Sequence, residues 1–304
     1  MLARLLLIAN VKGRSFTPKR LEVIAKAMSS EYRVQVAETK RQGHATHVAR
    51  GAVHEGFDVV VVMGGDGTLN EVANGLAGSR VPLGILPGGG TNVFARSLGI
   101  PEDLFEASAM LLEAAKTEPR RIPLGRADDR YFVFTCGMGF DGAIVRTVER
   151  RQRLKKAGGE WFYLWSGVLA FSRYDRRAPH LTVSWGPDLE HRRSGLYLAI
   201  GQKASPFTYL REREFRVCPD AELMDGVDLF ALDSMKLRTV LRALFQALSS
   251  GRQVKGRHAL YLHGEDRIVI EADRPLPVQM DGEYLGERTR LELEVVPDAL
   301  SVLA

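Results

Sequence analysis

Glycine and acidic residues are concentrated in one short stretch that could hold a phosphate group. The stretch Gly64-Gly65-Asp66-Gly67-Thr68-Leu69-Asn70-Glu71 follows an apolar run, 58–63, and opens a segment with helical periodicity, 69–76. Glycines let an anion approach the backbone N–H groups, and the start of a helix adds favourable partial charge. Asp66 is then placed to hold Mg²⁺ or to bind a nucleotide. The alternative is a tight turn in which Asp66 only caps the helix.

A second glycine-rich stretch, Pro87-Gly88-Gly89-Gly90-Thr91-Asn92, follows the next apolar run and precedes a short helical pattern, 93–98. If the two runs are neighbouring strands of a parallel sheet, both loops emerge at the same edge, where ligands collect. The Thr91 hydroxyl and the Asn92 amide would then be available to a triphosphate, whereas a flexible connector is the alternative. The chain contains no Gly-x-x-x-x-Gly-Lys-[Ser/Thr] pattern, which excludes a P-loop NTPase.

A third acidic feature, Asp281-Gly282-Glu283, lies on an expected turn between 277–280 and Tyr284-Leu285. An enzyme that phosphorylates an alcohol benefits from a carboxylate that accepts the hydroxyl proton as the oxygen attacks phosphorus. Asp-Gly is also the commonest hairpin signal, so a purely structural turn stays open.

The elements that would position these residues change character along the chain. Over the first 120 or so residues, β-rich runs at 5–9, 32–38, 59–63 and 82–86 alternate with helical patterns such as 18–30, which indicates a parallel sheet covered by helices. Farther on, short runs separated by turns are typical of an antiparallel β-rich domain, interrupted by helical stretches near 141–174 and 235–249. The sequence therefore predicts an α/β domain over 1–124 and a β-rich domain over 125–285.

Composition limits the classes of protein that the chain could belong to. A formal charge of +5 and an isoelectric point near 9.2 favour anionic partners, but no nucleic-acid recognition motif accompanies them, and we expect no nucleic acid. No apolar run reaches the roughly 18 residues of a membrane helix, and no signal-peptide cleavage pattern follows the N-terminus, so we expect a cytoplasmic protein. Cys136 and Cys218 lack further ligands at metal spacing and are expected to be core thiols.

Basic and aromatic residues occur together in one segment after residue 145. The segment contains Arg146, Arg150, Arg151, Arg153, Lys155 and Lys156, and then Trp161, Phe162, Tyr163 and Trp165. Basic charge beside interfacial aromatics fits peripheral contact with an anionic membrane surface. A solvated helix face followed by a helix packed on the β-rich domain is the alternative.

Taken in order, several of these stretches resemble the diacylglycerol kinase catalytic family, which shares the Gly-Gly-Asp-Gly-Thr signature with NAD kinases and phosphofructokinases. The resemblance runs across most of the chain. Its stretches are the opening run ending at Asn10, Thr39 with Gly43-His44-Ala45, 64–70, 88–96, Gly137-Met138-Gly139-Phe140-Asp141-Gly142, Asp225-Gly226 and Asp281-Gly282-Glu283.

The resemblance implies a lipid kinase with ATP and Mg²⁺ as cofactors and the hydroxyl of a membrane lipid, foremost diacylglycerol, as acceptor. It implies a Rossmann-like α/β domain of the NAD kinase and diacylglycerol kinase type, then a β-sandwich-rich domain, with 286–304 returning to the first. Glu283 takes the role of base, with Asp281 beside it and Asp66 at the phosphates. The implied ATP cradle comprises Asn10, Thr39, Gly64, Gly65, Asp66, Gly67, Thr68, Leu69, Asn70, Gly89, Gly90, Thr91 and Asn92.

The family also has a structural Mg²⁺ in its β-rich domain, near an Asp-Gly pair. The matching candidate ligands are the Asp225 carboxylate and the carbonyl oxygens of Glu222 and Val227, since Mg²⁺ prefers oxygen ligands. A plain Asp-Gly turn is the alternative at this position.

Three residues depart from the family pattern: Val11 stands where proline commonly follows Asn10, Gly90 where threonine is frequent, and Val93 where many members carry aspartate. The missing acid at position 93 leaves open a lipid- or nucleotide-binding regulator without turnover. NAD kinase is the nearest enzymatic alternative. The acyl preference and the oligomeric state, a homodimer included, are not determined by the sequence.

Overall fold

The computed structural model describes residues 2–11, 13, 16–150, 166–210 and 213–304. The chain divides into two compact units. One comprises Met1–Leu124 together with Val296–Ala304, and the other is Gly125–Val295. Within the described ranges, no helix combines the length and apolar character that crossing a bilayer requires.

The first unit is built on a parallel sheet in the order β4-β3-β1-β2. Its strands are β1 (Ala3–Ala9), β2 (Tyr32–Glu38), β3 (Val59–Gly64) and β4 (Leu83–Pro87), and the end of β16 (Glu283–Leu303) pairs in parallel with β4. Every residue of β3 and β4 is buried, as the continuous apolar runs predict for strands covered on both faces. The register pairs Gly64 with Pro87, so both strands end level and their loops begin side by side.

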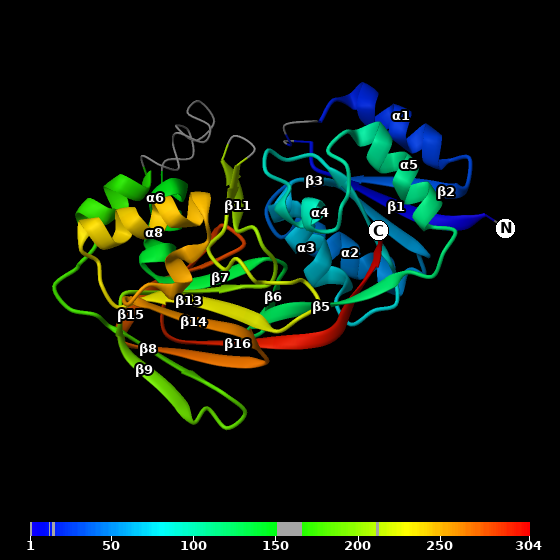
Figure 1. Cartoon of the computed structure of the whole chain (residues 1–304). Coiled ribbons are helices and arrows are strands. Elements are labelled where there is room, and N and C mark those ends of the chain that lie inside the picture. The colour runs from blue at the N-terminus through cyan, green and yellow to red at the C-terminus, as the bar shows by residue number, and fades with distance from the viewer. Residues whose placement is uncertain (1, 12, 14–15, 151–165, 211–212) are drawn as a thin grey trace. The chain divides into compact units, whose positions relative to one another are not determined.

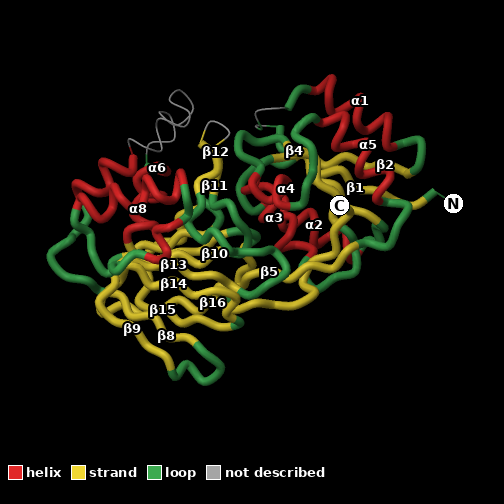
Figure 2. Tube along the Cα trace, in the orientation of Figure 1, coloured by secondary structure: helices red, strands yellow, loops and turns green. Residues whose placement is uncertain are grey.

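Helices cover both faces of this sheet (Figure 1 and Figure 2). They are α1 (Pro18–Met28), α2 (His44–His54), α3 (Asp66–Leu76), α4 (Val93–Ser97) and α5 (Leu104–Ala114). At the start of α1, the Thr17 hydroxyl accepts a hydrogen bond from the Arg20 N–H at 3.2 Å, the capping arrangement that the Thr-Pro pair indicates. In α2 the buried face consists of alanines, and a side chain at Gly75 of α3 would overlap Ala49, so small residues let α2 and α3 approach closely.

The second unit is antiparallel, with the strand order β14-β13-β10-β7-β15-β16. Strand β15 also pairs with β8, and β8 with β9. The strands are β5 (Arg120–Ala127, which begins in the first unit), β6 (Arg130–Phe132), β7 (Thr135–Gly139), β8 (Leu181–Trp185), β9 (His191–Leu196), β10 (Leu198–Gln202), β11 (Thr208–Leu210), β12 (Arg213–Phe215), β13 (Val227–Leu232), β14 (Ala259–Glu265), β15 (Arg267–Met280) and most of β16. Its helices include α6 (Phe140–Glu149), α8 (Leu237–Ser249) and the short 3₁₀ turn η1 (Arg252–Lys255), and residues 166–173 are also helical.

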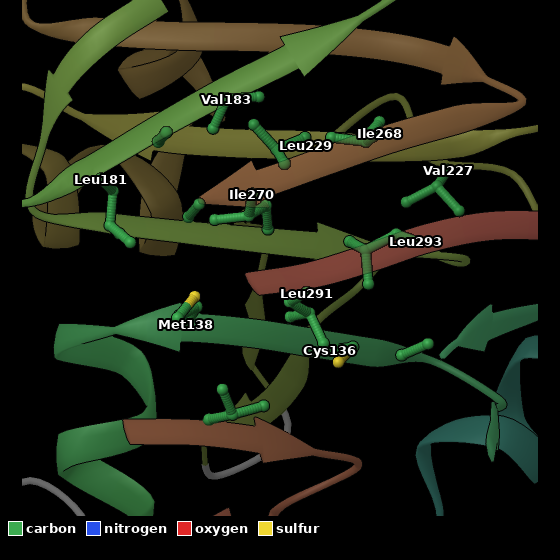
Figure 3. Close-up of a cluster of buried hydrophobic side chains, with 14 of the residues drawn as sticks. Cys136, Met138, Leu181, Val183, Val227, Leu229, Ile268, Ile270, Leu291 and Leu293 are labelled. Carbon is green, nitrogen blue, oxygen red and sulfur yellow. The ribbon is translucent and has the colours of Figure 1, made fainter. Parts of the chain in front are cut away.

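The core of the second unit contains side chains of β7, β8, β13, β15 and β16, which Figure 3 labels, and further side chains from β5, β6, β9, β10 and β14. Cys136 is fully buried in this cluster, and Cys218 is fully buried in a second one. Both thiols are free, which confirms the prediction of core cysteines. Burial strongly raises the pKa of each thiol.

The observed elements differ from the expected ones in extent. Helix α3 begins at Asp66, not at residue 69, and β15 and β16 run for 14 and 21 residues where only short runs were expected. Strands β5, β9, β11 and β12 were not predicted. Of the basic and aromatic segment, Arg146 and Arg150 are described, and residues 151–165 lie outside the described ranges.

Candidate functional site

The first glycine stretch forms the turn from β3 into α3. Gly65 is the residue before the helix, with an extended backbone and no side chain to bond the first helical amides. The Leu69 N–H donates to the Gly65 carbonyl at 3.0 Å, which closes the first turn of the helix. Because the leading amides of a helix have no carbonyl of the same helix to bond, the N–H groups of Gly67 and Thr68 suit an anion such as a phosphate.

The two glycine loops pack directly backbone against backbone. The Gly88 N–H donates to the Gly64 carbonyl at 2.8 Å. A Cβ at Gly65 would lie 3.0 Å from the Gly89 Cα, and a Cβ at Gly89 would lie 2.7 Å from the Gly65 Cα. These glycines are therefore required by loop packing, whereas a Cβ at the exposed Gly67 would meet open space.

The Asp66 carboxylate joins the two loops. One oxygen accepts from the Thr91 hydroxyl at 3.1 Å, and the other accepts from the Phe94 N–H at 3.3 Å. Burial raises the pKa of Asp66, and the hydrogen bonds from the Phe94 and Val93 amides and from Thr91 oppose that rise. The sequence left open that Asp66 only caps a helix. Asp66 does cap a helix, but that helix is α4, whereas Asp66 itself belongs to α3.

Asn92 cannot cap α4 because its side chain is used elsewhere. The Gly89 N–H donates to the Asn92 Oδ1 at 2.8 Å, and the Asn92 backbone is left-handed, with φ at 44°. Val93, where family members often carry an acid, is buried at the first position of α4. The Asp66 carboxylate therefore supplies the negative charge at this helix terminus.

The other residues expected in the cradle lie at the same sheet edge with different roles. The Asn10 Nδ2 donates to the Thr68 Oγ1 at 2.8 Å, and the Asn10 N–H donates to the Met63 carbonyl at 2.9 Å. Thr39 continues the sheet after β2, with its N–H bonded to the Ala9 carbonyl at 2.9 Å. Leu69 and Asn70 lie on the buried face of α3, while Gly90 is exposed.

Glu71 is a residue whose contacts the sequence did not reveal. Its carboxylate accepts from the Gly43 N–H at 2.9 Å and from the Ala45 N–H at 3.0 Å, at the start of α2. The residue before α2 is Gly43, which has no side chain for capping, so an acid must come from elsewhere. The sequence signal that could have pointed to such an acid was the glycine before α2, which cannot cap that helix.

In the second unit, Asp281 and Gly282 form the turn from β15 into β16. Asp281 is left-handed, with φ at 47°, and its carboxylate accepts three N–H groups, from Val133 at 2.8 Å, Phe134 at 3.1 Å and Thr135 at 2.9 Å. The Asp281 side chain is therefore committed to holding the 133–135 segment against the turn.

Glu283 begins β16 and forms an ion pair with Arg130 of β6. Both side chains are 30% exposed, so the carboxylate is reachable by solvent yet held in place. The next residue, Tyr284, donates its N–H to the Glu149 carboxylate at 2.9 Å. Arg130 was not singled out from the sequence, because nothing along the chain links it to a residue 153 positions away.

The buried Asp141 contacts the same turn through Gln279. The Gln279 amide donates to the Asp141 Oδ2 at 2.8 Å, and the Gln279 Oε1 accepts from the Gly282 N–H at 3.0 Å. Burial raises the pKa of Asp141 to about 7, and the Gln279 hydrogen bond opposes that rise. A side chain at Gly137 would overlap the Asp141 carboxylate, so the glycine of this motif makes room for the acid.

The stretch expected to bind a structural Mg²⁺ contacts a lysine instead. Lys203 is fully buried, and its ammonium donates to the carbonyls of Asp225 and, at 3.1 Å, Gly226. Desolvation lowers the pKa of Lys203 to about 8, against the opposing effect of nearby acids, Asp225 foremost. An ammonium there repels a divalent cation, so Glu222, Asp225 and Val227 do not suit Mg²⁺. Across the described part of the chain, no group of three acidic, histidine or cysteine side chains could hold a metal.

The chain is similar to known proteins over most of its length. Residues 4–150 match the family described as "Diacylglycerol kinase catalytic domain", and residues 135–304 match the "YegS C-terminal NAD kinase beta sandwich-like domain". The chain is 30% identical over 280 residues to a diacylglycerol kinase of Bacillus subtilis, covering 90% of this chain and 87% of the relative. It is 27% identical over 270 residues to a diacylglycerol kinase of Staphylococcus aureus (strain JH9), covering 88% and 81%.

Solved structures agree on the fold. A putative diacylglycerol kinase from Bacillus anthracis superposes with a TM-score of 0.79 at 20% sequence identity, covering 99% of this chain and 94% of that one. A second Bacillus anthracis structure, described as a diacylglycerol kinase, gives a TM-score of 0.71 at 19% identity, with coverage of 99% and 96%.

The loop packing predicts that two alanine substitutions differ in their effect on stability. Gly89→Ala places a methyl group against the Gly65 backbone, and we expect a loss of about 2 kcal/mol in the free energy of unfolding, measured with urea. Gly67→Ala is the matched control, because its methyl group meets open space in a helix and should leave stability unchanged or slightly raised. Equal stabilities of the two variants would contradict the loop packing.

The raised pKa of Asp141 predicts a pH dependence of stability. The folded state keeps its proton up to about pH 7, whereas an unfolded aspartate releases it near the ordinary value of 3.8, so stability should fall between these values as pH rises. Asp141→Asn keeps an acceptor for Gln279 and cannot ionise. In urea titrations, the unfolding free energy of the variant minus that of the wild type should therefore be larger at pH 8 than at pH 5. The same difference at both pH values would show that Asp141 does not titrate this way.

Lys203 predicts that the second unit needs no metal at the 222–227 stretch. We expect EDTA to leave the melting temperature of the nucleotide-free protein unchanged. Lys203→Met leaves the Asp225 and Gly226 carbonyls without this donor and should cost about 1–3 kcal/mol of unfolding free energy. A melting temperature that EDTA lowers in the wild type, but not in an Asp225→Asn variant, would instead place a metal at this stretch.

Proposed function

The chain belongs to the diacylglycerol kinase family, and on this basis we propose that it transfers the γ-phosphate of ATP to the hydroxyl group of a membrane lipid. Diacylglycerol is the acceptor in the names of the curated relatives, and phosphatidic acid would be the product. The observation that carries the proposal is the pair of locked glycine loops, because they present the first amides of α3 at the carboxyl ends of two parallel strands.

The phosphates of ATP would lie at the start of α3, along the glycine loops. The Gly67 and Thr68 amides would bind phosphate oxygens, while Thr91 and Asn10 hold Asp66 and Thr68 in place at the same edge. Fixed donors of this kind stabilise the charge that develops during transfer without having to reorganise. The loop contacts supply that rigidity, because Asp66 and the Gly64–Gly88 hydrogen bond hold both loops together.

Mg²⁺ bound with the nucleotide would neutralise phosphate charge, and Asp66 is the carboxylate at this edge that would face it. Asp66 fits that role because it is half-buried and already held by Thr91 and the α4 amides, so its oxygens are fixed in direction.

Glu283 is proposed as the general base. Its carboxylate would take the proton of the lipid hydroxyl while that oxygen forms a bond to the γ-phosphorus and the bond from phosphorus to the bridging oxygen of ADP breaks. Arg130 would orient the carboxylate through the ion pair. Asp281 would act as a positioning residue, since its oxygens are taken by three backbone N–H groups.

Removal of the base should abolish transfer while leaving the fold intact. We expect Glu283→Gln to lower kcat by about 10²- to 10⁴-fold toward diacylglycerol in mixed micelles, with the affinity for ATP unchanged. Glu287→Gln is the matched control, because Glu287 lies on the same strand and pairs with Arg146 at 2.7 Å. It should retain activity.

The measurements are the phospholipid formed from labelled ATP and, separately, ATP binding by calorimetry. Full turnover by Glu283→Gln would remove Glu283 as the base. ATP binding by the wild type without transfer to any lipid would favour a regulator that has lost turnover.

A further inference from the structure

The outer face of α8 is apolar although it packs on nothing that the structure describes. Five large side chains on one side of the helix are exposed, Leu237 by 56%, Leu241 by 55%, Leu244 by 43%, Phe245 by 71% and Leu248 by 37%. They represent nearly half of the exposed large hydrophobic residues in the described ranges. We name this set the α8 stripe.

The α8 stripe is separate from the face that holds the helix in place. Val240 and Ala243 pack against the second core cluster, and Ala247 is buried, which together anchor the opposite side of α8. The helix is therefore attached to the unit through side chains other than the stripe. An anchored helix with a second, exposed apolar face is typical of an interaction surface.

The chain segment that contains α8 has charge of one sign. From residue 235 to residue 264 the chain contains no aspartate or glutamate, and its six cationic side chains are Lys236, Arg238, Arg242, Arg252, Lys255 and Arg257. Arg238 and Arg242 are exposed and follow the α8 stripe along the helix. An apolar stripe bordered by cations matches the interface of an anionic bilayer, where acyl chains lie beneath phosphate groups.

A cationic hollow of about 1150 Å³ begins where α8 begins. Lys236, the residue before the helix, lines it together with Arg176, Arg177 and Arg193. Its two acids are already paired, Asp233 with Arg193 at 2.9 Å and Asp175 with Arg274 at 3.1 Å.

The cations that remain in the hollow suit a phosphate group. Arg176 stacks on the Phe171 ring at 4.3 Å, which holds its guanidinium in place. Arg177 and Lys236 form no ion pair within the described ranges. The hollow therefore has an excess of positive charge immediately beside the first residue of the α8 stripe.

We propose that the α8 stripe and this hollow form one docking surface for an anionic lipid bilayer, with the stripe entering the interface and the hollow taking a headgroup phosphate. The proposal rests on the proposed function, because a lipid acceptor must be reached in a membrane. A second copy of the chain fits less well, since a two-fold interface would bring the same cationic stretch against itself.

The test is sedimentation with vesicles of phosphatidylglycerol or of phosphatidylcholine, without ATP or acceptor. The double variant Leu241→Ser, Phe245→Ser should bind phosphatidylglycerol vesicles at least about tenfold more weakly. Phe105→Ser is the control, because Phe105 is 56% exposed on α5 of the first unit, and it should bind like the wild type.

Charge reversal tests the hollow separately. Arg177→Glu and Lys236→Glu should each weaken binding to phosphatidylglycerol vesicles by about fivefold or more, and Arg33→Glu on β2 should not. Salt should weaken wild-type binding in the same way. The wild type and the variants could bind inorganic phosphate with equal affinity and show no affinity for vesicles. That outcome would assign the hollow to a free anion and overturn the proposal.

Two further outcomes would also overturn it: unchanged vesicle binding by the α8 variant, or self-association of the wild type that the α8 variant loses in sedimentation velocity. A separate assay tests the proposed function without a membrane: turnover of a short-chain diacylglycerol dissolved as monomer. The α8 variant should match the wild type there. If neither turns over while vesicle binding follows the pattern above, docking stands and the kinase reaction does not.

Discussion

The direct backbone contact between the two glycine loops is the constraint on which the candidate site depends. The loops can lie against each other only because Gly65, Gly88 and Gly89 have no side chains, whereas a Cβ at Gly64 would meet Thr68 of its own loop. This contact brings the ends of β3 and β4 together, and the Asp66 carboxylate then spans the remaining gap to Thr91 and α4. The glycines that seemed from the sequence to serve the ligand alone serve the loops first, and the anion site is a consequence of their packing.

Three acidic side chains of the candidate sites hold backbone amides far from their own position in the chain. Asp66 and Glu71 leave the same helix, α3, and cap α4 and α2. Asp281 holds three amides of the 133–135 segment. Glu283 differs, because it pairs with another side chain, Arg130, and its own side chain is 30% exposed. This difference separates an acid that positions from one that could accept a proton.

The elements that could be predicted from the sequence are those with a strong local pattern. The β3 and β4 runs, the Thr-Pro start of α1 and the Asp-Gly turn all depend on neighbouring residues, and the structure contains each of them. Strand β9, with the sequence His-Arg-Arg-Ser-Gly-Leu, was missed because its four leading residues are polar and exposed and show no alternation. The partners of Asp66, Glu71 and Lys203 were beyond prediction, because each contact joins residues that only the tertiary fold brings together.

Strand β16 has a consequence for the order in which the molecule can form during synthesis. Its last residues, Val302 and Leu303, complete the parallel sheet beside β4, although β4 itself ends at Pro87. The first unit is thus interrupted by the whole of the second. A ribosome must release the chain through residue 303 before the edge of β4 receives this neighbour, so the second unit can finish folding while the sheet of the first is still incomplete.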